Sequence, residues 1–186
     1  MKKVICQMSL SLDGYVEGPK HELDWHLVDA DFNAHAVEML QQSDVLVMGR
    51  RTYELMASYW PTAEGDVGGV KDLMNGKPKL VFSRTLEEVD WQSSRLATGT
   101  LSEEVARLKQ APGDGLIPVG GSDLAAACLE QGLIDELRII LTPVLLGGGK
   151  TFVDAIKQRH PLKLLSTKAF KSGNVALTYE PARRQA

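Results

Sequence analysis

Apolar residues along this chain fall into two alternating patterns: short continuous runs, and stripes with the spacing of one helix face. The runs lie at residues 3–10, 44–48, 79–83 and 116–119. The helical stripes lie at residues 32–40, 50–58, 101–109 and 122–131. Continuous apolar runs are typical of strands buried on both faces of a parallel sheet. Because strands and helices alternate, the pattern predicts an α/β fold with a mainly parallel central sheet and flanking crossover helices.

The last part of the chain shows strand patterns alone. Residues 134–142 give the longest strand signal, and strands near 162–171 and 174–180 are joined by Ser172-Gly173, a hairpin turn. These patterns predict a C-terminal antiparallel hairpin. No linker or internal repeat interrupts the chain, so we expect residues 1–186 to form a single domain.

Shorter features complete the expected elements. A brief strand is expected at 15–17, and a glycine-containing loop with a short helical turn at 62–77. Ser102 is the expected N-cap of the helix at 101–109, and Ser122 or Asp123 that of the following helix, because hydroxyl and carboxylate groups accept from the first free N–H groups.

Composition and charge narrow the class of protein. The 186 residues are 44% hydrophobic and 24% charged, with a formal net charge of -3, which is ordinary for a globular protein. No basic stripe is available to neutralise phosphates, so no nucleic-acid partner is expected. Two isolated cysteines indicate a reducing compartment. No apolar stretch reaches the length of a membrane span and no signal peptide is recognised, so we expect a cytoplasmic protein without membrane contact.

Residues that could bind a ligand occur together in three turns, each directly after a predicted strand. They are Gly49-Arg50-Arg51-Thr52, Ser83-Arg84-Thr85 and Gly120-Gly121-Ser122-Asp123. The first and third precede helices, whose unpaired N–H groups and dipole favour phosphate. Each turn taken alone is equally explained as an ordinary junction with solvated arginines or a capping residue. Because ligands bind outside the carboxyl ends of parallel strands, the three together indicate an anionic cofactor with several phosphates.

Other chemistries find little support in the sequence. No G-x-G-x-x-G follows the first strand, and Gly149-Lys150-Thr151 lacks the earlier glycine of a Walker A loop, because Val144 stands there. We interpret that glycine run as a turn. The four histidines have no metal-ligand spacing, so no metal is expected. Three carboxylates surround Trp25 in the loop before the first helix, namely Asp24, Asp29 and Asp31. Each is either a solvated carboxylate, or a proton donor or substrate anchor.

Four segments carry a resemblance to a known family. They read MSLSLDGYVEG, VLVMGRRTYELM, KLVFSRT and IPVGGSDLAAACLEQGLIDELRIILTPVLLGGGKTF. In this order they resemble the dihydrofolate reductase-like superfamily, and more closely the branch that contains the C-terminal reductase domain of the bifunctional riboflavin-biosynthesis deaminase-reductase. The resemblance covers nearly the whole chain. It implies a dihydrofolate reductase-like sheet closed by an antiparallel hairpin, with NADPH lying across the sheet edge.

The resemblance also implies roles for individual residues. The turn Gly49, Arg50, Arg51 and Thr52 would hold phosphates near the adenosine end, and Ser83 and Arg84 would lie near the 2′-phosphate. The turn Gly120, Gly121, Ser122 and Asp123, with Leu124 beside it, would line the pyrophosphate. Met8 and Ser9 on the first strand would lie near the nicotinamide.

The expected activity is NADPH-dependent reduction of a small, heterocyclic substrate. The branch implies a likeness to 5-amino-6-(5-phosphoribosylamino)uracil reductase; the alternatives are a dihydrofolate or other pterin reductase, and a non-catalytic NADPH-binding module. The residues expected to manage the proton are Asp13, Asp29 or Asp31. Those expected either to stack on a planar substrate or to pack in the core are Trp25, Phe32 and Trp60. Relatives of this kind imply a homodimer, for which the apolar segment 139–146 is a candidate interface unless it is a buried strand.

Overall fold

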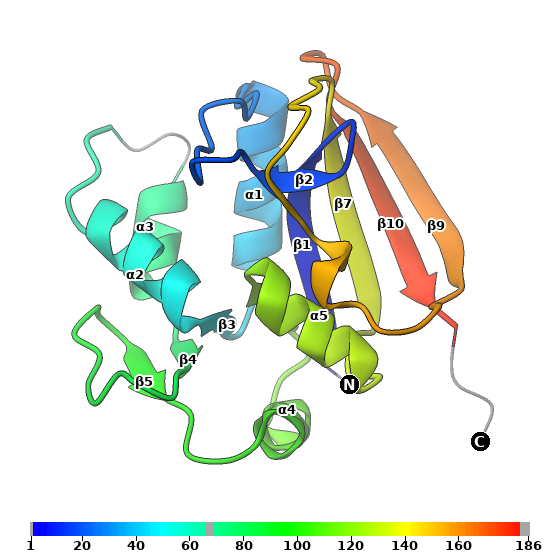
Figure 1. Ribbon diagram of the computed structural model, residues 1–186. Coiled ribbons are helices and arrows are strands. Elements are labelled where there is room, and N and C mark those ends of the chain that lie inside the picture. The colour runs from blue at the N-terminus through cyan, green and yellow to red at the C-terminus, as the bar shows by residue number, and fades with distance from the viewer. Residues whose placement is uncertain (1, 66–68, 183–186) are drawn as a thin grey trace.

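A computed structural model describes residues 2–65 and 69–182, and it is organised around one eight-stranded sheet (Figure 1). The strand order is β5-β4-β3-β6-β1-β7-β10-β9. The strands are β1 (Lys3–Ser11), β3 (Leu46–Gly49), β4 (Lys79–Phe82), β5 (Ser94–Leu96), β6 (Leu116–Gly120), β7 (Glu136–Thr142), β9 (Leu162–Ala169) and β10 (Val175–Pro181). A separate two-stranded sheet pairs β2 (Tyr15–Glu17) with β8 (Lys150–Thr151).

Six of the eight strands run in parallel, and the last two close the sheet. β1 pairs in parallel with β6 and β7, and β3 pairs in parallel with β4 and β6. β10 is antiparallel to both β7 and β9, which forms the C-terminal hairpin. The predicted fold class is therefore confirmed: a mainly parallel sheet with flanking helices and an antiparallel hairpin.

Helices cover both faces of the sheet and form two separate cores. They are α1 (Ala30–Gln41), α2 (Arg50–Tyr59), α3 (Val70–Gly76), α4 (Leu101–Gln110) and α5 (Ser122–Glu130), with a 3-10 turn at Val153–Ala155. α4 and α5 pack on one face, and α1, α2 and α3 on the other (Figure 1). Successive strand residues alternate between the cores: Val47 joins the first, and Leu46 and Met48 the second. Burial on both faces explains why these strands are continuous apolar runs.

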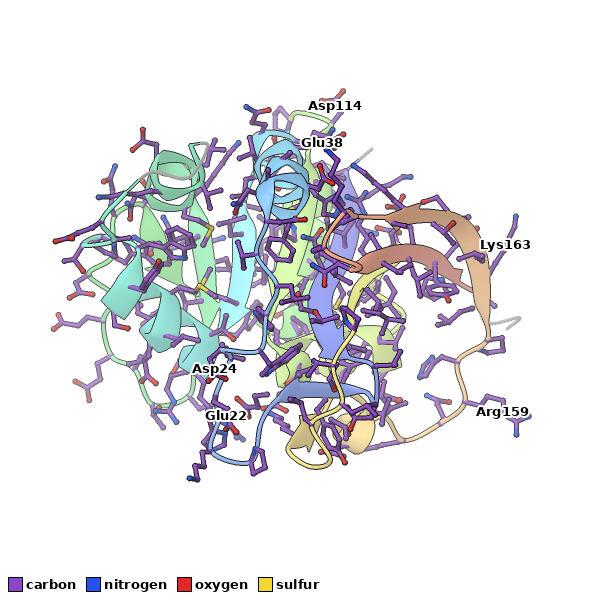
Figure 2. All side chains as sticks on the ribbon, turned by 90° about the horizontal axis from the view of Figure 1, so that it is seen from above. Glu22, Asp24, Glu38, Asp114, Arg159 and Lys163 are labelled. Carbon is purple, nitrogen blue, oxygen red and sulfur yellow. The ribbon has the colours of Figure 1, made fainter. Side chains whose placement is uncertain are left out.

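Charged side chains lie mainly outside these cores. Figure 2 labels six of them on the periphery of the molecule, namely Glu22, Asp24, Glu38, Asp114, Arg159 and Lys163.

The free cysteines Cys6 and Cys128 are buried. No helix among the described residues is long and apolar enough to cross a bilayer. Within the same residues, no three His, Cys, Asp or Glu side chains gather to hold a metal ion.

Several expectations for individual elements are corrected by the structure. The N-cap of α4 is Thr100 rather than Ser102, because the Thr100 side chain accepts from the Glu103 N–H and the Glu103 carboxylate accepts from the Thr100 N–H. The N-cap of α5 is Gly121, without a side-chain bond, rather than Ser122 or Asp123. The strand expected at 134–142 is shorter than β1, and β5 and β8 were not predicted. Residues 66–68 of the glycine-containing loop lie outside the described residues.

Candidate functional site

A cavity of about 1110 Å³ opens at the carboxyl ends of the parallel strands, from β1 across to the end of β5. Every residue that the sequence singled out for a cofactor lines it: Met8, Ser9, Gly49, Arg50, Arg51, Thr52, Ser83, Arg84, Gly120, Gly121, Ser122, Asp123 and Leu124. Pockets for single small ligands are typically about 300–1,000 Å³. The cavity therefore has room for a long ligand, or for two ligands side by side.

The start of α2 forms the middle of one wall. Its N-cap, Gly49, has extended backbone and makes no side-chain capping bond, so no side chain occupies the first N–H groups of the helix. Arg50 pairs with Glu54 at 3.2 Å, and Arg51 lies 3.9 Å from the carboxylate of Glu17. Both ion pairs are partly solvated and contribute little stability, so either guanidinium can exchange its carboxylate for a phosphate.

The start of α5 faces the start of α2. Gly121, its N-cap, adopts a left-handed φ of 94°. A Cβ at this position would collide with the hydroxyl of Thr52 in the first turn of α2. Glycine is therefore required twice over, for its φ and for the close approach of the two turns. Two helix N-termini consequently face the same region of the cavity and favour an anion there.

The third turn lies at the end of β4. The Ser83 hydroxyl accepts from the N–H groups of Thr85 and Leu86, which fixes the turn. Arg84 is exposed on the cavity and has no ion-pair partner among residues 2–65 and 69–182. It is thus a cation without a counter-charge, beside the segment 97–101 that lines the same end of the cavity.

The other end of the cavity contains polar side chains that the sequence analysis did not identify. Glu17 Oε1 lies 2.9 Å from His21 Nδ1, and the two side chains line the cavity beside Arg51. Gln7 Oε1 and His26 Nε2 are buried and have no hydrogen-bond partner among the described residues. Burial lowers the pKa of His26, which favours its neutral imidazole near pH 7. No local pattern marks these residues, because only the packing of loop 18–29 against β1 and α2 brings them together.

The glycine run after β7 supports this end of the cavity. Gly149 adopts a φ of 132°, and a Cβ there would collide with the carbonyl oxygen of Glu17. This contact lets β8 pair with β2, as the register Glu17 with Lys150 shows. Lys150 in turn lines the cavity and pairs with Asp123 at 2.7 Å. The run is a turn, as interpreted, and it fixes the backbone of Glu17.

The three carboxylates expected to manage a proton do not line the cavity. Asp13 accepts from the Ser11 hydroxyl and from the Leu146 and Gly147 N–H groups, and the bond from Ser11 contributes most to lowering the pKa of Asp13. Its bonds tie the β1–β2 turn to the segment that follows β7. These bonds give Asp13 a structural role in the turn, and its part in proton transfer stays a prediction.

Asp29 and Asp31 likewise bind backbone. Asp29 caps α1 by accepting from the Phe32 N–H, which contributes most to lowering the pKa of Asp29, and it also accepts from the Ser172 N–H. Asp31 accepts from the Lys171 N–H. The two carboxylates hold the β9–β10 turn against the start of α1, and their part in proton transfer stays a prediction.

The aromatic residues expected to contact a substrate also lie outside the lining. Trp25 donates from Nε1 to the Glu22 carbonyl and packs edge-on against His26, with ring centroids 4.2 Å apart. Trp60 packs against the second core, and neither it nor Phe32 lines the cavity. The apolar lining of the cavity instead includes Val16, Leu23, Leu55 and Met56.

Comparison with known proteins identifies the family of this chain. The model of the RibD C-terminal domain matches residues 2–176. The chain belongs to the RibD C-terminal domain family. A relative of this RibD C-terminal domain is the uncharacterized protein YyaP of Bacillus subtilis (strain 168), 36% identical over 181 residues that cover 96% of this chain and 94% of YyaP.

Solved structures show the same fold. A putative riboflavin biosynthesis protein from Shewanella sp. PV-4 superposes with a TM-score of 0.77 and 27% identity, covering 97% of this chain and 99% of that one. The deaminase/reductase from Thermotoga maritima gives 0.71 at 16% identity, covering 97% of this chain and 57% of that one. Dihydrofolate reductase from Enterococcus faecalis, complexed with NADP(H), gives 0.66 at 15% identity with 97% of both chains covered. The predicted resemblance is confirmed: this RibD C-terminal domain has a dihydrofolate reductase-like, reductase-type fold.

Proposed function

We propose that the chain is an NADPH-dependent reductase of a small heterocyclic substrate. The observation that carries the proposal is the convergence of three anion-binding turns on one cavity: two helix N-termini without side-chain caps, and Arg84 without a counter-charge. A phosphate-rich ligand fits such a set of donors. The Thr52 hydroxyl takes the space that a Cβ at Gly121 would need, so the starts of α2 and α5 come close together, which supports binding of one pyrophosphate by both.

The distribution of these turns supports one orientation of the proposed cofactor. From β5 to β1 the sheet order has four steps, or roughly 19 Å at the usual spacing between strands. That span suits an extended dinucleotide. Arg84 would bind the 2′-phosphate at the β4 end, α2 and α5 would bind the pyrophosphate, and Met8 and Ser9 would border the nicotinamide.

The chemistry divides between cofactor and chain. When bound, the nicotinamide supplies hydride. The chain binds and orients both ligands, and the loop carrying Leu23 and His26 excludes water from the end near β1. Glu17 and His21, joined at 2.9 Å, form the pair at the cavity wall that can hold a proton, so we infer that they are better candidates for proton transfer than Asp13, Asp29 or Asp31.

The substrate follows from the family by analogy. Reduction of 5-amino-6-(5-phosphoribosylamino)uracil is the first candidate, since the Thermotoga maritima neighbour carries that reductase name. The alternatives are a pterin such as dihydrofolate, and binding of NADPH without turnover. An NADPH-oxidation assay with aminopyrimidine and pterin panels separates these alternatives, because saturable binding without turnover on any substrate would favour the non-catalytic module.

Arg84 provides the test of cofactor identity. Arg84→Gln should weaken NADPH binding by roughly ten- to a hundredfold, as expected for loss of a charge-assisted bond to phosphate, and should leave NADH binding unchanged. Fluorescence titration of both nucleotides measures the two dissociation constants. Arg159→Gln, an exposed arginine outside the cavity lining, is the matched control and should change neither. Equal losses for NADPH and NADH would refute the placement of the 2′-phosphate.

A further inference from the structure

We propose that Glu104 is a positioning residue for the nucleotide. It fixes residues 97–100, the link between β5 and α4, which form the wall of the cavity at the adenosine end. The inference rests on the proposed function, because it takes the bound molecule to be NADPH. Residues Ala97, Gly99 and Thr100 of the link, and Leu101 after it, line the cavity beside Ser83, Arg84 and Thr85. Glu104 does not line it and would act through the link.

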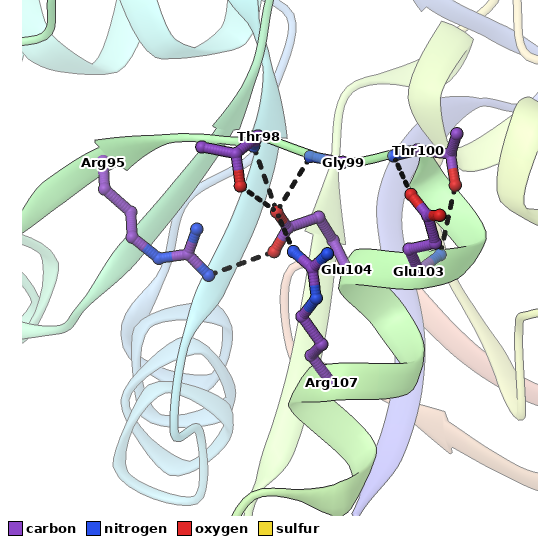
Figure 3. Close-up of polar contacts among 7 residues, drawn as sticks. All are labelled: Arg95, Thr98, Gly99, Thr100, Glu103, Glu104 and Arg107. Atoms are coloured by element: carbon purple, nitrogen blue, oxygen red, sulfur yellow. Dashed lines mark hydrogen bonds and ion pairs between the residues drawn. The ribbon is translucent and has the colours of Figure 1, made fainter.

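The side chain of Glu104 is fully buried, and its carboxylate gathers the donors of the link (Figure 3). The Thr98 N–H donates to Oε1 at 3.0 Å, the Gly99 N–H at 3.2 Å and the Thr98 hydroxyl at 3.3 Å. The next N–H, that of Thr100, donates to Glu103 at 2.8 Å. Three successive N–H groups are therefore held by carboxylates of the first turn of α4, which fixes the backbone of the link.

Two arginines neutralise the buried carboxylate. Arg95 from β5 lies 3.2 Å from Oε2, and Arg107 from α4 lies 3.0 Å from Oε1 (Figure 3). Burial opposes ionisation of Glu104, but the bonds from Thr98, Arg95 and Gly99 outweigh it and lower its pKa. The carboxylate is therefore ionised near pH 7, and the three side chains together carry one net positive charge beside the end of the cavity assigned to the 2′-phosphate.

Few hydrogen bonds from other described residues hold the link on its cavity side. Ala97 is held to β4 by its N–H, which donates to the Val81 carbonyl at 2.9 Å. From there to Thr100 the N–H groups of the link donate to Glu104 and Glu103. Without the Glu104 carboxylate the Thr98 and Gly99 N–H groups lose their acceptor, so the link must move to satisfy them. That movement would change the adenosine end of the cavity and leave the end near β1 as it is.

Positioning and electrostatics predict opposite results for one substitution. Glu104→Gln replaces two accepting oxygens by one accepting oxygen and one NH2 donor, so either the link N–H groups or an arginine must face a donor. The substitution also raises the net charge of the three-residue group from one to two, which on electrostatics alone would tighten binding of an anion. If the carboxylate positions the link, the same substitution weakens binding despite the added positive charge.

The experiment titrates wild type and Glu104→Gln with NADPH and with reduced nicotinamide mononucleotide, which lacks the adenosine half. We expect NADPH binding to weaken about tenfold, the scale of a wall displaced by a fraction of an ångström, and mononucleotide binding to stay unchanged. Glu38→Gln, the same charge change on α1 outside the cavity lining, is the control and should leave both constants unchanged. Unfolding midpoints are recorded so that titrations are made well below them.

The outcomes separate the two claims. If wild type binds neither nicotinamide nucleotide, the proposed function fails and the inference fails with it. If wild type binds NADPH and Glu104→Gln binds it equally or more tightly, or loses both ligands to the same degree, only the positioning role is overturned. Should Glu104→Gln not fold, Glu104→Asp keeps the charge but retracts the carboxylate, and the same selective loss for NADPH decides the question.

Discussion

A single substitution at Gly121 tests whether the starts of α2 and α5 bind the cofactor. Gly121→Val should abolish measurable NADPH binding, because the new Cβ collides with Thr52 at the point where α2 and α5 face each other. It should also cost about 1–3 kcal/mol of stability, because Gly121 has a positive φ in a backbone conformation that other residues rarely adopt. Gly132→Val is a matched control, since Gly132 has a φ of 68° and open space around it. Calorimetry should show a loss of stability for both variants, larger for Gly121→Val because Thr52 must shift, and NADPH binding should be lost only by Gly121→Val; retained binding there would contradict a close backbone approach.

The residues of the three turns that line the cavity could be selected from the sequence, whereas Glu17, His21 and His26 at the other end could not. Glycine and arginine after an apolar run are a local signal, and parallel strands bring such signals to one edge. Glu17 and His21 have no such signal, since only the pairing of β2 with β8 and the packing of loop 18–29 place them at the wall. Asp29 is the opposite case, since it does have a local signal, a carboxylate just before a helix. That signal fits an N-cap as well as it fits a proton donor.

At the scale of elements, Glu130 joins the end of α5 to the segment that precedes β9. Its carboxylate accepts from the Lys157 N–H and the Gln158 amide and pairs with His160 at 2.9 Å. The bond from His160 is the largest of the causes that lower the pKa of Glu130 from 4.5 to about 2. Because the folded pKa lies below the unfolded one, the stabilisation is complete above about pH 4.5 and disappears as the pH falls towards 2.

Glu130→Gln tests this linkage. The variant should have a lower urea midpoint than wild type at pH 7, because it lacks the carboxylate partner of His160. The gap between the two midpoints should narrow as the pH falls from about 4.5 to about 2. Urea unfolding at a series of pH values gives both curves, and a gap that stays constant over that interval would contradict the depressed pKa.

The elements that periodicity predicted are those with many buried apolar positions. β1, β3, β4 and β6 are each buried on both faces, and their runs were recognised. β5 and β8 have only three and two residues, too few for a period, and they exist because a neighbouring strand pairs with them. The N-cap of α4 was misplaced by two residues because Thr100 and Ser102 are chemically alike, and only the reciprocal bond of Glu103 distinguishes them.

For the whole molecule, the homodimer implied by the resemblance stays a prediction. The edge strand β9 exposes Leu162, Leu164 and Leu165 by 40%, 51% and 46%, and exposed apolar side chains on an edge strand favour association. Light scattering after size exclusion should give twice the chain mass of 20.3 kDa, and Leu164→Lys should shift it towards one chain. A wild type that elutes as a single chain would contradict the dimer.

The central claim is that a nicotinamide dinucleotide lies along the carboxyl edge of the sheet, and a crystal structure of the chain grown with NADPH tests it most directly. The account predicts electron density with the pyrophosphate between the starts of α2 and α5, the 2′-phosphate against Arg84, and the nicotinamide beside Met8 and Ser9. Density for the dinucleotide on another face, or in the reverse direction along the sheet, would contradict it.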